Sequence, residues 1–323
     1  MLVDSIWGAD PVIDWSALRD LYAPEVLRDE ATADTARFKL AMKRFASSFP
    51  EGHVRLRGDV NGLYEREIGG AFGLTLIHLS DARIAVNRRP VTYEILPSGV
   101  GYLRCSILAE LDASGNVTGS MDSLVASLHD AVAAFDAAPV SGVIVDIRDN
   151  PGGFDALAAF FGGLFYDHTE LYEQASFYDD AAGQFEVLPQ LTLYLEPQGS
   201  YFGGPVVCLV NAGTASSAEG VAMAIQRLPQ GHVMGFYGTH GSFGLVAGES
   251  ALPAGLGIQF PLGRSLDSNS VIQVDSDRTL TGGVVPDLRI PLTVETVQRK
   301  FAGAVDVELE EAQAFLTSQT PGR

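Results

Sequence analysis

The spacing of hydrophobic residues predicts that the first hundred residues change from helices to strands. Apolar positions recur at helical intervals through residues 13–49, with Asp14 as a candidate N-cap, until Pro50 and Gly52 interrupt the pattern. Residues 60–100 instead contain short apolar runs separated by turn residues, which predict strands. The chain therefore begins with a helical segment that is followed by a strand-rich segment.

The middle of the chain alternates between buried strands and helices. Near-continuous apolar runs at 140–147 and 205–211 predict strands that are covered on both faces. A helical pattern follows each run, at 156–165 and 214–228, and another precedes them at 121–137. Repeated β–α units of this kind are typical of an α/β core with a largely parallel sheet. The last third is richer in strands and turns and ends in a candidate helix.

Composition narrows the classes of partner. Of the 323 residues, 46% are hydrophobic, which is enough for a large core or two domains. The 40 acidic and 21 basic residues give a net charge of −19, which argues against nucleic acid and anionic membranes as partners. We see no apolar run long enough to span a membrane and no signal peptide in the first residues. Cys105 and Cys208 lie in apolar runs that predict buried side chains, and no residue cluster has the spacing of a metal site.

Candidate chemistry gathers where two predicted strands end. In an α/β sheet, residues that follow the carboxyl ends of the strands converge on one crevice. Ser216 lies there at the start of a predicted helix, where unpaired N–H groups favour a nucleophile and an oxyanion. Alternatively it only caps the helix, as Thr214 or Ser217 would. In "DNPGG", Gly152 and Gly153 are free to turn their N–H groups toward an oxyanion, although an ordinary turn also explains them.

These segments resemble the C-terminal processing, or tail-specific, serine peptidases. "VIVDIRDNPGG" is similar to the strand and loop of that family, and "VCLVNAGTASSAEGVAMAI" to its nucleophile segment. Family-like segments such as "MGFYGTHGSFG" and "GGVVPDLRIPL" follow in the expected order, so that the resemblance spans roughly residues 12–295. It implies a crotonase- and Clp-protease-like α/β fold and hydrolysis of peptide bonds through an acyl-enzyme on Ser216. The oxyanion hole would then come from N–H groups of Gly152, Gly153 and Ser217.

The resemblance also identifies a candidate base. Many members of the family use a lysine that follows the serine in a glycine-rich turn, but Ser242 or a neighbour occupies that place here. Another branch uses a histidine from an N-terminal turn, which "PEGHVRL" resembles, so that His53 is the predicted general base. His240 is the alternative base, and each histidine could instead be an ordinary turn residue.

A third residue is expected to orient the histidine. In the histidine-using branch this is an acid near the segment "GVVPD", where Thr281 stands in this chain. Asp275 and Asp277, just upstream, are therefore the candidate orienting acids. Both could also be solvated turn residues, which would leave a serine–histidine dyad.

The resemblance predicts three parts of the chain. Residues 1–58 form an N-terminal helical segment that ends in the His53 turn. Residues 59–98 form a short strand-rich remnant where members usually carry a PDZ domain, and residues 99–323 form the α/β peptidase core with a β-rich C-terminal part and a final helix. With the PDZ domain missing or strongly shortened, the cleft itself would select the substrate.

The sequence thus favours a serine endopeptidase that acts on a protein or peptide substrate without a cofactor or metal. The alternative is a non-catalytic protein that binds an apolar ligand or a peptide on the same fold. An acyl-CoA enzyme of the crotonase type is disfavoured, because a serine at a helix start does not suit an enolate-stabilising site. Cleavage specificity and oligomeric state are left open. Members of the family are often exported, whereas the chain as given shows no export signal.

Overall fold

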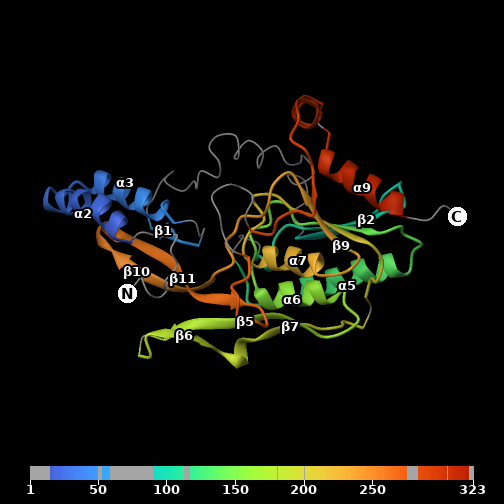
Figure 1. Ribbon diagram of the computed structural model, residues 1–323, viewed down its shortest axis with the longest axis horizontal. Helices are drawn as coiled ribbons and strands as arrows, with labels where there is room; N and C mark the ends of the chain where they lie inside the picture. Colours follow the sequence, from blue (N-terminus) through green and yellow to red (C-terminus); the bar gives the residue numbers. More distant parts are fainter. Residues whose placement is uncertain are drawn as a thin grey trace. The chain divides into compact units, whose positions relative to one another are not determined.

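The protein forms two compact units that alternate along the chain. The computed structural model describes residues 15–49, 53–58, 90–112, 117–179, 181–199, 201–274, 283–303 and 305–319 (Figure 1). The first unit comprises Met1–Glu67, Gln174–Thr192 and Gly244–Gln273, and the second comprises Ile68–Glu173, Leu193–Phe243 and Val274–Arg323. The predicted three-part division stays a prediction, since most of the predicted PDZ remnant lies outside the described residues.

A six-stranded sheet forms the centre of the second unit. Its strands are, in order, β12 (Leu288–Arg289), β9 (Gly231–Gly235), β8 (Val206–Leu209), β4 (Val143–Asp146), β3 (Gly101–Cys105) and β2 (Val91–Ile95). Neighbouring strands are parallel, except that β2 pairs antiparallel with β3. The predicted α/β core is therefore confirmed.

Alternate residues of these strands pack into two apolar layers. Val145 and Cys208 belong to one buried cluster, together with residues of the helices α5 (Asp122–Asp136), α6 (Asp155–Gly163) and α7 (Ser217–Gln226). Ile144 and Val207 belong to another, together with residues of α9 (Val307–Gln319). Helices thus cover both faces of the sheet, as near-continuous apolar strands require (Figure 1). The short helical segments α8 (Val294–Val297) and η3 (Gln298–Ala302) precede α9.

The first unit is built on an antiparallel sheet beside a pair of helices. The helices are α2 (Trp15–Ala31) and α3 (Thr35–Ala46). The strands are β1 (Arg55–Arg57), the second half of β5 (Glu170–Asp179), β6 (Gln184–Val187), β10 (Leu245–Leu252) and β11 (Leu256–Leu266). Central strand β11 pairs with β1, β10 and β5.

Shorter elements complete the two units. In the second unit, β7 (Leu193–Leu195) pairs with the first half of β5. The single 3-10 turns η1 (Pro189–Leu191) and η2 (Pro253–Gly255) lie in the first unit. No helix among the described residues is both long and apolar enough to cross a membrane.

Candidate active site

Ser216 occupies the turn between β8 and α7. Because β4 and β8 are neighbouring parallel strands, the loops that follow them lie at the same end of the sheet. Ser216 immediately precedes α7 and adopts φ 57° and ψ −135°, a conformation that costs a non-glycine residue about 1–3 kcal/mol. It is partly exposed, between the buried Ala215 and Ser217. The turn therefore holds a strained and accessible serine at the positive end of a helix.

The loop that follows β4 lies directly against this turn. Gly152 has φ 94°, and a Cβ added there would lie 2.7 Å from Ser216 Cβ and 2.9 Å from Ser217 N. A Cβ added at Gly153 would lie 2.0 Å from the carbonyl oxygen of Leu108. Neither position accepts a larger residue without displacement of backbone, so the two glycines permit the loop to contact the serine turn.

The buried side chain of Asn150 organises the same loop. Its Oδ1 accepts the Gly152 N–H at 2.9 Å, and its Nδ2 donates to the Cys105 carbonyl at 3.0 Å. Its own carbonyl accepts the Ala215 N–H at 2.9 Å. Asn150 therefore joins β3 to the serine turn, a role that the sequence analysis did not assign. Because the Gly152 N–H already has an acceptor, the Gly153 N–H is the stronger oxyanion candidate of the two.

The neighbouring serine has a different environment from Ser216. The Ser217 hydroxyl lies 2.6 Å from Asp155 Oδ1 and 3.0 Å from the Gly153 carbonyl oxygen, and the residue is buried. These contacts hold Ser217 Oγ as a donor between two acceptors. Its backbone N–H lies in the first turn of α7, where the helix supplies no acceptor, so that it can face an oxyanion.

Glu219 connects the serine turn to the loop Thr239–Ser242. The Glu219 Oε2 accepts the N–H groups of Ser216 at 2.9 Å and Ser242 at 2.8 Å. The Oε1 accepts the hydroxyl of Thr239 and the N–H of Gly241, both at 2.6 Å. Burial raises the pKa of the Glu219 carboxyl to about 7, although these hydrogen bonds favour the charged form. Sequence reasoning missed this residue, because one glutamate in a helical pattern resembles a solvated position.

His240, the alternative base, lies in this loop. Its backbone N–H donates to the Thr214 carbonyl at 2.8 Å, which ties the loop to the segment just before Ser216. The imidazole Nδ1 hydrogen-bonds to the hydroxyl of the fully buried Ser242. The residue is partly exposed. Ser216 and His240 thus belong to the same unit, on segments joined by backbone hydrogen bonds.

The predicted base and its orienting acid are described less completely. His53 belongs to the first unit, just before β1, and is only 6% exposed. Its pairing with Ser216 stays a prediction. Asp275 and Asp277 lie outside the described residues. In the described part of the chain, no group of three or more histidine, cysteine or acidic residues is arranged to hold a metal ion.

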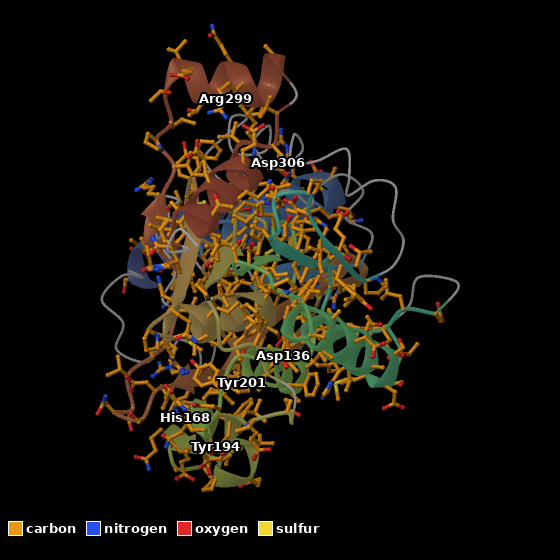
Figure 2. All side chains as sticks on the ribbon, turned by 90° about the vertical axis from the view of Figure 1, so that its right-hand side faces the viewer. Asp136, His168, Tyr194, Tyr201, Arg299 and Asp306 are labelled. Carbon is orange, nitrogen blue, oxygen red and sulfur yellow. The ribbon has the colours of Figure 1, made fainter. Side chains whose placement is uncertain are left out.

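A buried network of ion pairs links the loop after β4 to the start of α9. The Arg148 guanidinium donates to both carboxylate oxygens of Asp146 at 2.9 and 2.7 Å, and to both of Asp306 at 2.8 and 2.9 Å. Asp306 immediately precedes α9 and is labelled in Figure 2. Burial opposes ionisation of both carboxyls, but the charge of Arg148 outweighs it and lowers the pKa of each. The network anchors the C-terminal helix to the loop that carries the two glycines.

Solved structures with a similar fold include a candidate peptidase, a lipoprotein and a protein complexed with lactacystin. A candidate peptidase from Parabacteroides merdae matches 96% of this chain and 90% of its own, with 22% identity and a TM-score of 0.66. A lipoprotein from Streptococcus agalactiae matches 95% of this chain and 89% of its own, with 16% identity and a TM-score of 0.52. Mature CPAF, complexed with lactacystin, matches 71% of this chain and 55% of its own, with 13% identity and a TM-score of 0.52.

The family comparison completes the identification. The family match defines a serine peptidase, whose substrate is a protein or peptide. Residues 99–290 match the model of peptidase family S41, and the chain therefore belongs to that family. The matched range contains both the glycine loop and the Ser216 turn. The resemblance to the C-terminal processing peptidases is thereby confirmed.

Proposed function

We propose that the protein is an endopeptidase in which Ser216 forms the acyl-enzyme. Ser216 Oγ attacks the scissile carbonyl carbon while a histidine accepts the hydroxyl proton. The tetrahedral intermediate collapses, and the leaving amine departs with that proton. Water then attacks the acyl carbon, the histidine again accepts a proton, and the carboxylic product leaves with Ser216 restored. The observation that carries the proposal is the strained, accessible Ser216 at the start of α7, held against the glycine loop.

Two backbone N–H groups are proposed to hold the oxyanion. The Gly153 N–H and the Ser217 N–H flank Ser216 in the two segments that Gly152 brings into contact. Neither has an acceptor among the described residues. Donors that are fixed before the reaction stabilise the developing charge without reorganisation, and one such donor typically contributes about 2.7–4 kcal/mol.

His53 is proposed as the general base, oriented by Asp275 or Asp277. An imidazole has a pKa suited to accepting the serine proton near neutral pH. His240 is the competing candidate, since its loop is hydrogen-bonded to the segment before Ser216. If His53 is the base, His53→Ala loses activity, and if His240 is the base, His240→Ala loses activity. One experiment therefore separates the two assignments.

Labelling with a fluorophosphonate probe tests the nucleophile. We expect the wild-type chain and Ser217→Ala to be labelled and Ser216→Ala to be unlabelled. Labelling that survives in Ser216→Ala would contradict the assignment. Casein digestion by His53→Ala and His240→Ala then identifies the base, because the variant without the base should lose at least 100-fold in kcat. A wild-type chain that neither reacts with the probe nor digests casein, but binds an apolar ligand, would favour the non-catalytic alternative.

A further inference from the structure

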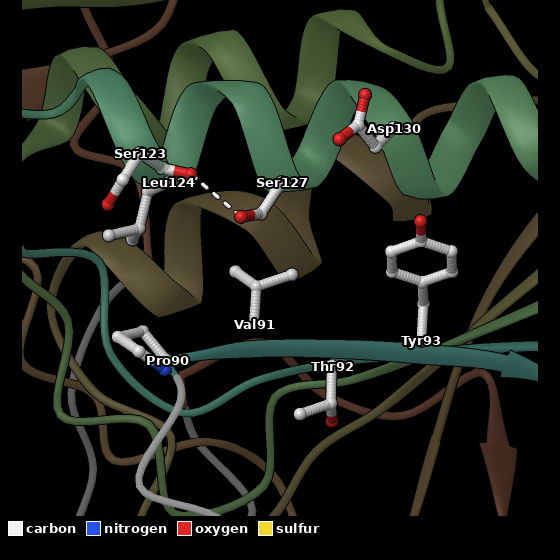
Figure 3. A pocket seen from close by; sticks show the side chains of 8 residues that line it. All are labelled: Pro90, Val91, Thr92, Tyr93, Ser123, Leu124, Ser127 and Asp130. Atoms are coloured by element: carbon white, nitrogen blue, oxygen red, sulfur yellow. Dashed lines mark hydrogen bonds between the residues drawn. The ribbon is translucent and has the colours of Figure 1, made fainter.

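We propose that the groove between β2 and α5 binds an extended, basic segment of the substrate, which adds a strand to the edge of the sheet. The inference rests on the proposed peptidase function and concerns how the substrate is recognised away from Ser216. The groove has a volume of about 810 Å³ (Figure 3). Its lining residues are Pro90, Val91, Thr92, Tyr93, Ser123, Leu124, Ser127 and Asp130.

Strand β2 presents an open edge. The Ser106 N–H donates to the Pro90 carbonyl at 2.9 Å, and the Leu96 N–H donates to the Val100 carbonyl at 2.8 Å. In this antiparallel register, residues 92 and 94 also bond toward β3, so the N–H and C=O groups of residues 91, 93 and 95 face the opposite side. Among the described strands β2 pairs only with β3. Alternating free donors and acceptors of this kind are what an extended peptide pairs with.

Both apolar and polar side chains line the groove between this edge and α5. Figure 3 shows the Val91 and Tyr93 side chains pointing from β2 toward α5, while Thr92 points the other way. Val91 and Leu124 are buried and form the floor. Tyr93 remains 44% exposed although its ring packs edge-on against Phe135. A strand added to β2 would therefore place alternate side chains on an apolar floor beside the Tyr93 ring.

Negative charge at the groove favours a peptide segment with basic side chains. Neither β2 nor α5 contains a lysine or arginine. Of the acidic residues that the two elements carry, Glu94, Asp122, Asp130 and Asp136, it is Asp130 that lines the groove. The exposed Asp130 lines the groove and forms no ion pair with any described residue. A lysine or arginine side chain directed toward α5 would supply that missing charge.

The groove begins at the end of the sheet that carries the site. Val91 pairs with Cys105, the last residue of β3, and the Cys105 carbonyl is bonded to the Asn150 side chain of the glycine loop. Three strand spacings of about 4.8 Å separate β2 from β8, so the Ser216 turn lies about 15 Å away along the sheet. An extended chain covers that distance in about four or five residues. A substrate that reaches both places therefore extends about ten residues to one side of the scissile bond.

Peptide binding to the Ser216→Ala chain tests the proposal without dependence on activity. The probes are two fluorescein-labelled decapeptides, one alternating lysine with valine and the other glutamate with valine. We expect fluorescence polarisation to show binding of the lysine peptide only. Asp130→Lys should weaken that binding at least fivefold, whereas Asp136→Lys, on the same helix and with the same change in net charge, should change it less than twofold. Tyr93→Pro, which removes an N–H group from the open edge, should also weaken it.

Activity then connects the groove to proteolysis. In the chain with Ser216 intact, Asp130→Lys should raise the KM for casein about fivefold relative to Asp136→Lys and leave kcat unchanged. Equal peptide affinity in the two lysine variants would overturn the proposal, as would equal binding of the acidic peptide. A dimer that Asp130→Lys alone dissociates would also overturn it, because the groove would then be occupied by a second copy. Fluorophosphonate labelling reports separately on the proposed function, so failure of the groove and failure of the nucleophile are distinguishable.

Discussion

Replacing Glu219 with glutamine should separate the stability of the fold from the organisation of the site. In the wild-type chain, the charged carboxylate is buried and accepts hydrogen bonds from four groups, among them the N–H groups of Ser216 and Ser242. Glutamine has the shape of the protonated acid and, like it, presents a donor to one pair of these groups. The variant therefore imitates the low-pH form of Glu219 at every pH.

The sign and size of the effect on stability follow from the pKa. Burial raises the pKa of Glu219 from 4.5 to about 7, so the folded chain binds this proton more tightly than the unfolded chain. The stability that Glu219 contributes is fully present below about pH 4.5 and is lost as the pH rises through about 7. Between pH 5 and pH 8 the loss amounts to about 2.5 kcal/mol, at about 1.4 kcal/mol for each pKa unit. The excess of Glu219→Gln over the wild type in free energy of unfolding should therefore grow by about 2.5 kcal/mol between pH 5 and pH 8.

Activity should change in the opposite direction. At pH 8 an amide cannot accept both pairs of donors, so either the Ser216 turn or the loop of Ser242 must move. Displacement of about 1 Å near reacting atoms can cost about 100-fold in rate. We therefore expect fluorophosphonate labelling at pH 8 to slow by about that factor in Glu219→Gln.

Urea unfolding at pH 5 and pH 8 measures the first effect, with the exposed Glu186→Gln as the control. If the difference between wild type and Glu219→Gln is the same at both pH values, the burial argument for Glu219 is refuted. If the variant is labelled at the wild-type rate, the hydrogen bond from Ser216 does not position the nucleophile.

Two further substitutions test the glycine loop and the network below it. Gly152→Ala should cost more than about 1 kcal/mol and slow probe labelling at least tenfold, because its Cβ would lie 2.7 Å from Ser216 Cβ. Gly183→Ala, also at positive φ but with no atom within 4 Å of its Cβ, should leave labelling unchanged, and equal labelling rates in the two variants would contradict the packing argument. Asp306→Asn should lower the free energy of unfolding by about 1–3 kcal/mol, since the buried Arg148 loses a charged partner. A loss below about 0.5 kcal/mol in urea unfolding would exclude that role.

The hydrophobic patterns of the sequence predicted the α/β core, in which segments close in sequence also pack against each other. The buried strands that end before "DNPGG" and "NAGTASSAEG", and the helices after them, follow from apolar runs and periodicity. Parallel neighbours then place the two loops at one edge, so Ser216 and the two glycines could be predicted to meet. The burial of Cys105 and Cys208 followed in the same way from their apolar runs.

Long-range pairings could not be predicted in the same way. Strand β1 pairs with β11, and these two strands are far apart in the sequence. No local period records such a partner. The role of Glu219 was missed for a similar reason, because the loop at Thr239–Ser242 that supplies three of its donors is distant in sequence. The function of a buried polar residue depends on its partners, and the sequence does not name them.

The chain has three lysines, and none lies in the loop Thr239–Ser242. Of the three lysines, Lys39 and Lys43 lie in α3 of the first unit, and the buried Lys300 is paired with Glu308. In that loop, the buried Ser242 has its N–H bonded to Glu219, and its hydroxyl contacts the His240 ring. This loop therefore supplies no amine that could act as the base, which agrees with the histidine base that we propose.

The contact with Ser242 also defines what His240 would need in order to act. If Nδ1 donates its proton to the Ser242 hydroxyl, the lone pair of the neutral ring lies on Nε2, which is the atom that would have to accept the Ser216 proton. Ser242→Ala removes that tautomer preference. A change in the pH dependence of casein hydrolysis in Ser242→Ala would therefore favour His240 as the base. If the pH dependence is unchanged in Ser242→Ala and casein hydrolysis is lost in His53→Ala, the base is instead His53 of the first unit.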